Sequence, residues 1–334
     1  MKILFIGGTG NISAACSRLA ISRGHDLHLL NRGKQPIGIE GATSVVADIS
    51  DEKAVAQALA GRYFDAVVNF IAFTPADIER DMRLFGGRCG QYIFISSASA
   101  YQKPATSPYI REDTPLVNPH WDYSRNKIAA EERLLHGLRE QGFPGVIVRP
   151  SLTYDTVIPL ALASWNQYTL IQRMIDGKRV VVHGDGTSVW AVTHSDDFAV
   201  GLVGLLGHQQ ATGHAFHITT DELLTWDQMH QAAAAAVGVE ARIVHMPSEL
   251  IAKASAFEEG NLLGDKAVST IFDNSKIKQF VPDFNPTIRF SDGIRRTLAW
   301  FDADPKRKVI DPGGDALIEK LLTAYDQAAA VLQA

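Results

Sequence analysis

Two residues four positions apart, Tyr123 and Lys127, could transfer a proton together. They open a stretch with helical spacing, and residues four apart share one face of a helix. An ammonium group near a phenol favours the phenolate, so we expect Lys127 to lower the pKa of Tyr123 and make it a base near neutral pH. Because this spacing is common by chance, a surface pair is the alternative interpretation.

A run of small polar residues favours the catalytic interpretation. Residues 96–101 read Ser-Ser-Ala-Ser-Ala-Tyr and follow an apolar segment, residues 91–95, that is typical of a buried strand. Ligands of open parallel sheets bind at the carboxyl ends of the strands. We therefore expect this run to face the same site as Tyr123.

A glycine-rich turn stands near the start of the chain. Residues 7–13 read Gly-Gly-Thr-Gly-Asn-Ile-Ser, between an apolar strand at residues 2–6 and a predicted helix at residues 11–23. The glycines permit a tight turn and the close approach of a pyrophosphate, which the helix N-terminus attracts. Ser13 replaces the last glycine of the usual pattern and is small enough for close packing; a turn that needs glycine for geometry alone is the alternative. The sequence predicts that a dinucleotide binds Gly7, Thr9, Gly10, Asn11 and Ile12.

The residues after the second predicted strand, residues 26–30, indicate which dinucleotide binds. Asn31 stands where such folds place an acid that binds the adenine ribose, and Arg32 and Lys34 follow it. Loss of the acid and gain of cations favour a 2′-phosphate, hence NADP(H) over NAD, unless both cations are solvated loop charges. Asp48 is placed either to touch the adenine amine or to cap the next helix. Further cofactor-binding candidates are Ile49, Ala72, Tyr123, Lys127 and Pro150.

The surrounding segments must position these residues. Strand-like and helix-like segments alternate up to about residue 150, which predicts an α/β, Rossmann-type, doubly wound parallel sheet. The pattern then changes, and a smaller C-terminal α/β domain, interleaved with the first, is expected to bind the substrate. We assign residues 1–154 and about 187–220 to the dinucleotide domain, and about 155–186 and 221–334 to the substrate domain.

Composition excludes several other classes. The chain has 334 residues, a net charge of −5 and two cysteines. A mildly acidic chain is not built to neutralise nucleic-acid phosphates, and two cysteines are too few for a disulfide framework or a zinc ribbon. The two cysteines are typical of reduced thiols, so we expect a cytoplasmic protein. No run of apolar residues is long enough to span a membrane. The eleven histidines show no metal-binding spacing, and no metal is predicted.

Taken together, these motifs resemble the extended short-chain dehydrogenase/reductase superfamily, the NAD-dependent epimerase/dehydratase branch. The resemblance also uses Arg149-Pro150, Gly184-Asp185-Gly186, Asp196-Asp197 and the segment 291–294 before Trp300. It implies that Ser97 is the catalytic serine, Tyr123 the acid/base and Lys127 its partner. It also implies hydride transfer between NAD(P) and a secondary hydroxyl or carbonyl of a small molecule. A homodimer through the helix of Tyr123 is a further implication.

Two departures from the family pattern narrow the substrate. Ala98 and Ser99 stand where family dehydratases carry an Asp-Glu pair, so a 4,6-dehydratase is not expected. Trp190 stands where nucleotide-sugar enzymes place a phosphate-binding arginine, which favours a smaller polyol, sugar derivative or other secondary alcohol. Alternatively, Trp190 belongs to the core and Arg173 or Arg179 binds the phosphate. The substrate candidates are Ser99, Trp121, Trp190 and His194, although a lone histidine is more often structural.

The function stays open at two points. An epimerase and a dehydrogenase differ in whether the keto intermediate leaves the site, and no residue decides between them. The same fold also serves proteins without catalysis, so a cofactor-sensing or RNA-binding protein is the rival hypothesis. That rival hypothesis is disfavoured because the chain has both Tyr123 and Lys127 and carries a net negative charge.

Overall fold

The centre of the molecule is a seven-stranded parallel sheet. The computed structural model describes residues 1–33 and 38–333, and the strand order is β12-β7-β5-β4-β1-β2-β3. The order reverses between β1 and β4, and this switch point is where open parallel sheets bind ligands. The predicted doubly wound sheet is confirmed. Its strands are β1 (Lys2–Ile6), β2 (Asp26–Asn31), β3 (Thr43–Val46), β4 (Ala66–Asn69), β5 (Tyr92–Ile95), β7 (Gly145–Pro150) and β12 (Ala215–Ile218).

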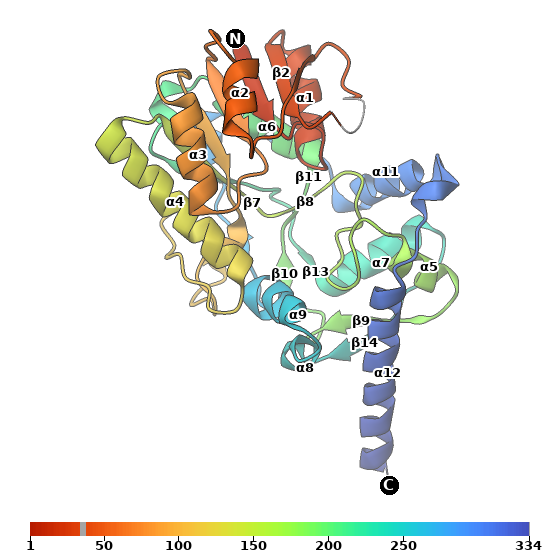
Figure 1. Cartoon of the computed structure of the whole chain (residues 1–334). Helices are drawn as coiled ribbons and strands as arrows, with labels where there is room; N and C mark the ends of the chain where they lie inside the picture. The colour runs from red at the N-terminus through yellow and green to blue at the C-terminus, as the bar shows by residue number, and fades with distance from the viewer. Residues whose placement is uncertain (34–37, 334) are drawn as a thin grey trace.

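Helices cover both faces of this sheet (Figure 1). Side chains alternate along each strand, so Ile3 and Phe5 face one helix layer while Leu4 and Ile6 face the other. The first layer contains α1 (Ser13–Ser22), α6 (Ser195–Leu205) and α10 (Ser275–Phe280). The second contains α2 (Glu52–Ala58), α3 (Pro75–Phe85) and α4 (Asp122–Gln141).

A second part of the chain lies beyond the carboxyl ends of the strands and has its own apolar core (Figure 1). It is built on the parallel pair β9 (Arg179–His183) and β14 (Arg242–Met246). Short pairs join it to the sheet: β8 (Leu152–Tyr154) with β11 (Val192–His194), β10 (Val189–Trp190) with β13 (Leu224–Thr225), and β6 (Tyr109–Ile110) with β15 (Ile271–Phe272). Its helices are α5 (Thr169–Ile175), α7 (Trp226–Ala236), α8 (Ser248–Ala252), α9 (Ala256–Asn261), α11 (Phe290–Asp302) and α12 (Pro312–Gln333).

The packing departs from the predicted organisation in the late segments. Residues Ile277, Val281 and Phe284 join the core of the first sheet face, although the sequence places 221–334 in the substrate domain. Among residues 1–33 and 38–333, no helix is both long and apolar enough to cross a membrane.

Candidate active site

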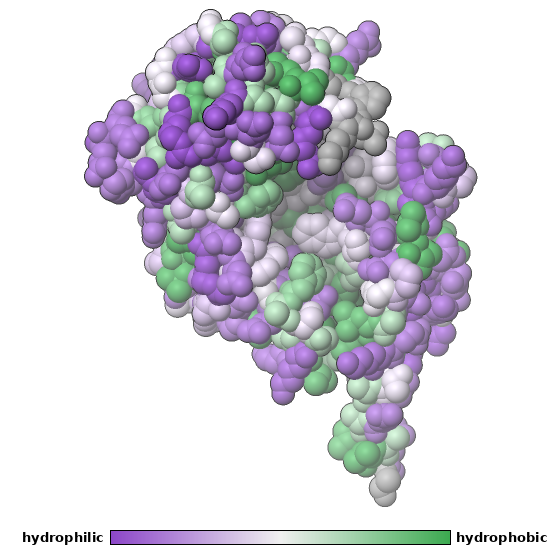
Figure 2. Space-filling model, viewed as in Figure 1, coloured by the Kyte–Doolittle hydropathy of each residue, from purple (hydrophilic) through white to green (hydrophobic). Residues whose placement is uncertain are grey.

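A cavity of about 780 Å³ lies between the sheet and the second part of the chain. Figure 2 shows the hollow between the two parts on the face in view. Its walls bring together residues from Asn11 to Leu317, because several strands of the sheet end there and the second part of the chain folds over them. The predicted site residues among its walls are Asn11, Ile12, Ser97, Ser99, Trp121, Tyr123, Lys127, Pro150 and Trp190.

Helix α4 carries the Tyr-Lys pair into this cavity. Lys127 is 1% exposed, and its Nζ donates hydrogen bonds to the carbonyl oxygens of Ala72 at 2.7 Å and Ile95 at 2.8 Å. The same Nζ lies 4.4 Å from the ring centre of Phe73 and 5.7 Å from that of Tyr123. Burial lowers the pKa of Lys127 to about 7, although the charge of Glu131 opposes this shift. The lysine is therefore held rigidly beside the phenol.

The pKa of Tyr123 differs from the prediction. Burial raises it to about 12, whereas the sequence predicts that Lys127 lowers it. The group that favours the phenolate is the hydroxyl of Ser97, through a hydrogen bond, and the charge of Asp265 acts in the opposite direction. The prediction was wrong because spacing along a helix does not show how deeply the phenol is buried. In this structure Tyr123 keeps its proton at neutral pH.

Three serines form a hydrogen-bonded chain beside the tyrosine. The hydroxyls of Ser97 and Ser99 are 2.9 Å apart, and Ser124 Oγ donates to Ser99 Oγ at 2.8 Å. Ser97 also caps the short 3₁₀ helix Ala98–Ala100 that follows β5. Ser97 thus has a fixed position at the cavity wall, next to the phenol, while the buried Ser99 supports it.

The glycine-rich turn has no room for a side chain at Gly7 or Gly8. Gly7 has a φ of +82°, and a Cβ there would lie 2.7 Å from Ile71 Cγ2. A Cβ on Gly8 would lie 2.4 Å from Leu29 Cδ2. Ser13 Oγ donates to the carbonyl of Gly7 at 2.6 Å and accepts from the N–H of Gly10 at 2.8 Å, so this serine shapes the turn. Thr9 and Gly10 are exposed at its tip.

Asn11 links this turn to the second part of the chain. Its Nδ2 donates to the Thr153 carbonyl at 2.8 Å, and its Oδ1 accepts from the Asp155 N–H at 2.9 Å. Its own carbonyl accepts from Ser195 Oγ at 3.0 Å. Both side-chain groups are therefore engaged by the protein, and Asn11 fixes the start of α1 against β8 and α6.

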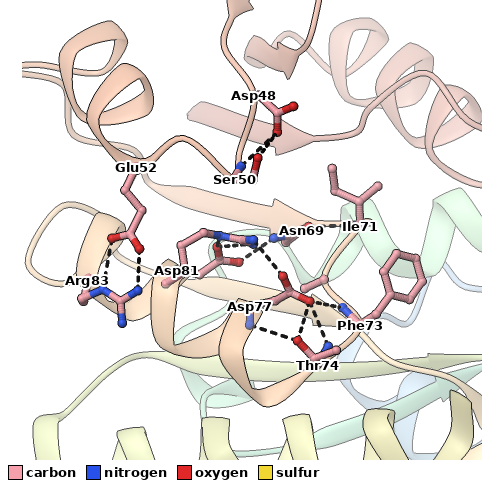
Figure 3. Close-up of polar contacts among 12 residues, drawn as sticks. Asp48, Ser50, Glu52, Asn69, Ile71, Phe73, Thr74, Asp77, Asp81 and Arg83 are labelled. Carbon is pink, nitrogen blue, oxygen red and sulfur yellow. Dashed lines mark hydrogen bonds and ion pairs between the residues drawn. The ribbon is translucent and has the colours of Figure 1, made fainter. Parts of the chain in front are cut away.

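The loop between β4 and α3 is fixed by a buried carboxylate. Asp81 accepts hydrogen bonds from Asn69 Nδ2 and from the Tyr92 hydroxyl, both at 2.5 Å, and is paired with Arg80 at 2.8 Å. Asn69 in turn accepts from the N–H of Ile71, and Asp77 accepts from the N–H groups of Phe73 and Thr74 (Figure 3). These contacts hold Ala72 and Phe73, which surround the ammonium of Lys127.

The remaining cofactor candidates lie at the ends of β2 and β3. Asn31 ends β2, and its Nδ2 is buried without a hydrogen-bond partner among the described residues. Arg32 and Asp48 are exposed and Ile49 is buried, while Lys34 lies outside the described residues. Asp48 accepts from Ser50, and Asp51 is the residue that caps α2, so the alternative role of Asp48 as helix cap was wrong (Figure 3).

The residues that the sequence proposes for substrate binding differ in whether they can reach the cavity. Trp121 lies 5.0 Å from the Tyr123 ring at the start of α4. Trp190 lines the cavity but is only 2% exposed and packs 6.2 Å from Trp226, as the core alternative expects. His194 is not among the residues that line the cavity; its Nδ1 accepts from the Asp196 N–H and caps α6.

The two arginines that the sequence offers as alternative phosphate-binding residues lie outside the cavity. Arg173 is paired with Asp315 and Glu319, and Arg179 with Asp326, all three on α12. Neither arginine is among the residues that line the cavity. The cation that does line it on the substrate side is Lys266, with Glu258 and Asp265 beside it. Sequence reasoning missed these three residues, because no motif marks them.

Comparisons with known proteins agree with this architecture. The family model "NAD dependent epimerase/dehydratase family" matches residues 3–219. A curated relative is the chloroplast stem-loop binding protein of 41 kDa b from Arabidopsis thaliana, 28% identical over 73% of this chain and 65% of its own length. Less than two thirds of that relative is therefore matched. Another is the 2′-dehydrokanamycin reductase from Streptomyces kanamyceticus, 23% identical over 85% of this chain and 80% of its length.

A solved structure shows the same fold at low sequence identity. The UDP-glucose 4-epimerase from Bifidobacterium longum, in complex with NAD⁺ and UDP, superposes with a TM-score of 0.73. It is 16% identical, and the match covers 92% of this chain and 100% of the epimerase. Because the family model covers well over half of the sequence, the chain belongs to the NAD dependent epimerase/dehydratase family.

Proposed function

We propose that this protein transfers a hydride between NADP(H) and a secondary hydroxyl or carbonyl carbon of a small, phosphate-free ring compound. The observation that carries the proposal is a single cavity in which Ser97, Tyr123 and Lys127 meet the start of the glycine-rich helix at Asn11 and Ile12. Proton transfer and cofactor binding can therefore occur in one space.

The residues at the switch point suit a dinucleotide. Gly7 and Gly8 let the turn pack closely against Ile71 and Leu29. A pyrophosphate would meet the backbone N–H groups at the start of α1 that follows this turn. The buried, unpartnered Nδ2 of Asn31 would gain an acceptor from the adenosine ribose, and exposed Arg32 would bind a 2′-phosphate. Asp48, Ile49, Ala72 and Pro150 complete the proposed cofactor site. When bound, the nicotinamide supplies or accepts the hydride.

The geometry of Lys127 supports its proposed role. An ammonium group has three N–H donors, and two of them bind the carbonyl oxygens of Ala72 and Ile95. The third has no hydrogen-bond partner within the described part of the chain, and we assign it to the nicotinamide ribose. Two fixed bonds leave the ammonium little freedom, so it can orient the cofactor without rearranging.

The state of Tyr123 favours carbonyl reduction. Because burial raises its pKa to about 12, the phenol carries a proton that it can donate to a carbonyl oxygen as that oxygen gains charge. Ser97, which hydrogen-bonds the phenol, is placed to bind the same oxygen. The similarity to 2′-dehydrokanamycin reductase supports this direction.

The proposal is tested by following NADPH oxidation with a panel of cyclic ketones, including dehydrogenated sugars and aminocyclitols. We expect at least one ketone to be reduced, with free exchange of NADP(H). Protein that is purified with tightly held nicotinamide and interconverts two epimeric alcohols would instead identify an epimerase. We also propose a homodimer through α4, which size-exclusion chromatography with light scattering would test.

A further inference from the structure

One wall of the cavity comes from α9 and from the π-helical turn Leu262–Lys266. We call the four polar residues Glu258, Asn261, Asp265 and Lys266 the recognition wall. It packs directly on the segment before α4: a Cβ on Gly260 would lie 2.3 Å from Trp121 Cδ1. Since the Trp121 ring is 5.0 Å from the Tyr123 ring, this wall faces whatever molecule Tyr123 protonates.

The lysine of this wall is already neutralised. Lys266 is fully buried, and its Nζ donates to Asn261 Oδ1 at 2.7 Å and to Asp265 Oδ2 at 3.0 Å. Asn118 and Lys103 fix the turn by donating to the carbonyls of Gly264 and Asp265. Lys266 therefore cannot swing out to meet a phosphate without breaking a buried ion pair.

The other charges of the cavity also disfavour an anion. Among the described lining residues, the cations are Lys127 and Lys266, the acids are Glu258, Asp265 and Asp311, and there is no arginine. Lys127 already binds two carbonyl oxygens. A diphosphate on the substrate side would thus find no uncompensated cation and would meet two further carboxylates.

Glu258 is the feature that points to a ligand. Its side chain is buried, with the residue 5% exposed, and Oε2 accepts from Asn261 Nδ2 at 3.2 Å. In the part of the chain that the structure describes, Oε1 has no hydrogen-bond partner, although the residue lines the cavity. Burial raises the pKa of this carboxyl group. Oε1 is not among the fully buried atoms that lack a partner, so it is accessible from the cavity. A ligand in the cavity that brings a hydrogen-bond donor could therefore reach this oxygen.

We propose that Glu258 recognises the substrate by accepting a hydrogen bond from one of its donor groups, an ammonium or a hydroxyl, on a ring that carries no phosphate. Trp121, Trp165 and Phe257 line the cavity around the wall and offer apolar faces to such a ring. An ammonium group is favoured over a hydroxyl, because a charge-assisted bond to a buried carboxylate is the stronger one. This assignment rests on the proposed hydride transfer for the position of the reacting carbon.

The test measures ligand binding separately from chemistry. Calorimetry with the NADP⁺-saturated full chain would compare aminocyclitols and amino sugars, their hydroxyl analogues, and UDP-glucose with dTDP-glucose. We expect a phosphate-free ring to bind more tightly than either nucleotide sugar. Tighter binding of a nucleotide sugar, or no binding of any phosphate-free ring, would overturn the inference.

Variants of two adjacent glutamates then locate the contact. Glu258→Gln keeps the shape of the side chain but removes its charge. It should lower the affinity for an amino ligand about 10- to 100-fold and the affinity for a hydroxyl ligand by less. Glu259→Gln is the matched control, since Glu259 lies on the same helix but is exposed and faces His120. Equal effects of the two variants would contradict the role of Glu258.

The two proposals fail in different ways. If Glu258→Gln lowers the affinity for the ring compound but Tyr123→Phe leaves hydride transfer intact, the proposed function fails and the recognition role stands. If Tyr123→Phe abolishes hydride transfer while Glu258→Gln has no effect on binding, the recognition role alone fails. A melting temperature close to that of the wild type would show that each variant is folded.

Discussion

The ammonium group of Lys127 donates a 2.7 Å hydrogen bond to the carbonyl oxygen of Ala72. Ala72 belongs to the loop after β4, which hydrogen bonds of Asn69, Asp77 and Asp81 hold in place (Figure 3). The position of the proposed catalytic lysine therefore depends on the buried carboxylate of Asp81, to which Lys127 makes no hydrogen bond.

Asp81→Ala should destabilise the fold and impair catalysis. The substitution leaves Arg80, Asn69 and Tyr92 without their shared acceptor, and removal of one partner of a buried pair costs about 3–5 kcal/mol. Urea unfolding would measure this loss. Glu79→Ala is the control on the same helix, because its exposed pair with Arg133 is worth only about 0–1 kcal/mol. Similar losses for the two variants would show that the network does not support the loop.

Stability should rise with pH above neutrality because of Lys127. The unfolded lysine keeps its proton up to its usual pKa of 10.5, whereas the folded one loses it at about 7. Between these values the unfolded state binds more protons, so the free energy of unfolding increases by up to about 1.4 kcal/mol per pH unit. Below about pH 7 this group contributes no slope.

Comparison with Lys127→Met isolates this effect, since the variant has no proton to exchange. Urea unfolding at about pH 7 and about pH 9 should show the wild type gaining roughly 2 kcal/mol relative to the variant, by the same linkage. Parallel pH dependences of the two proteins would mean that Lys127 is not desolvated as the structure indicates.

The proposed preference for NADP can be tested with thermal shifts. A ligand that binds only the native state raises its melting temperature, so NADP⁺ should produce a larger shift than NAD⁺ at equal concentration. Arg32→Ala should lower the affinity for NADP⁺ about 10- to 100-fold, because a charge-assisted bond to the 2′-phosphate is lost. The affinity for NAD⁺ should stay unchanged. Arg23→Ala, at the exposed end of α1, is the control. Equal shifts from both cofactors would refute the preference, and no shift from either would refute the cofactor site.

RNA binding is the rival hypothesis of the sequence analysis, and one relative is named a stem-loop binding protein. With a net charge of −5, we expect no binding to a stem-loop RNA at physiological ionic strength. Fluorescence anisotropy of a labelled stem-loop at about 50 and 150 mM salt would measure this. Binding that persists at the higher concentration and weakens with salt would support the rival.

The parts of the structure that the sequence predicts well are those with local signals. Apolar runs that are followed by glycine or serine mark β1 and β5, so Gly7 and Ser96 stand directly after the ends of parallel strands. These segments are periodic or bounded by turn residues, so short-range patterns suffice.

The recognition wall could not be predicted in the same way. Glu258 and Lys266 meet Tyr123 only because α9 packs on Trp121, a contact between segments more than 130 residues apart. A π-helical turn has no local sequence pattern that identifies it. Likewise, the burial that raises the pKa of Tyr123 comes from tertiary packing, so the spacing of Tyr123 and Lys127 predicted the pair but not its protonation.

The central claim is that Tyr123 exchanges the proton while the cofactor site is formed by other residues. Tyr123→Phe removes only the hydroxyl, and the exposed Tyr325→Phe on α12 is the matched control. The measurement is single-turnover NADPH oxidation with the best ketone of the panel, together with NADP⁺ affinity. We predict a rate about 10²- to 10⁴-fold lower with nearly unchanged affinity, the range expected for loss of a general acid. A Tyr123→Phe protein that oxidises NADPH at the wild-type rate would contradict the account.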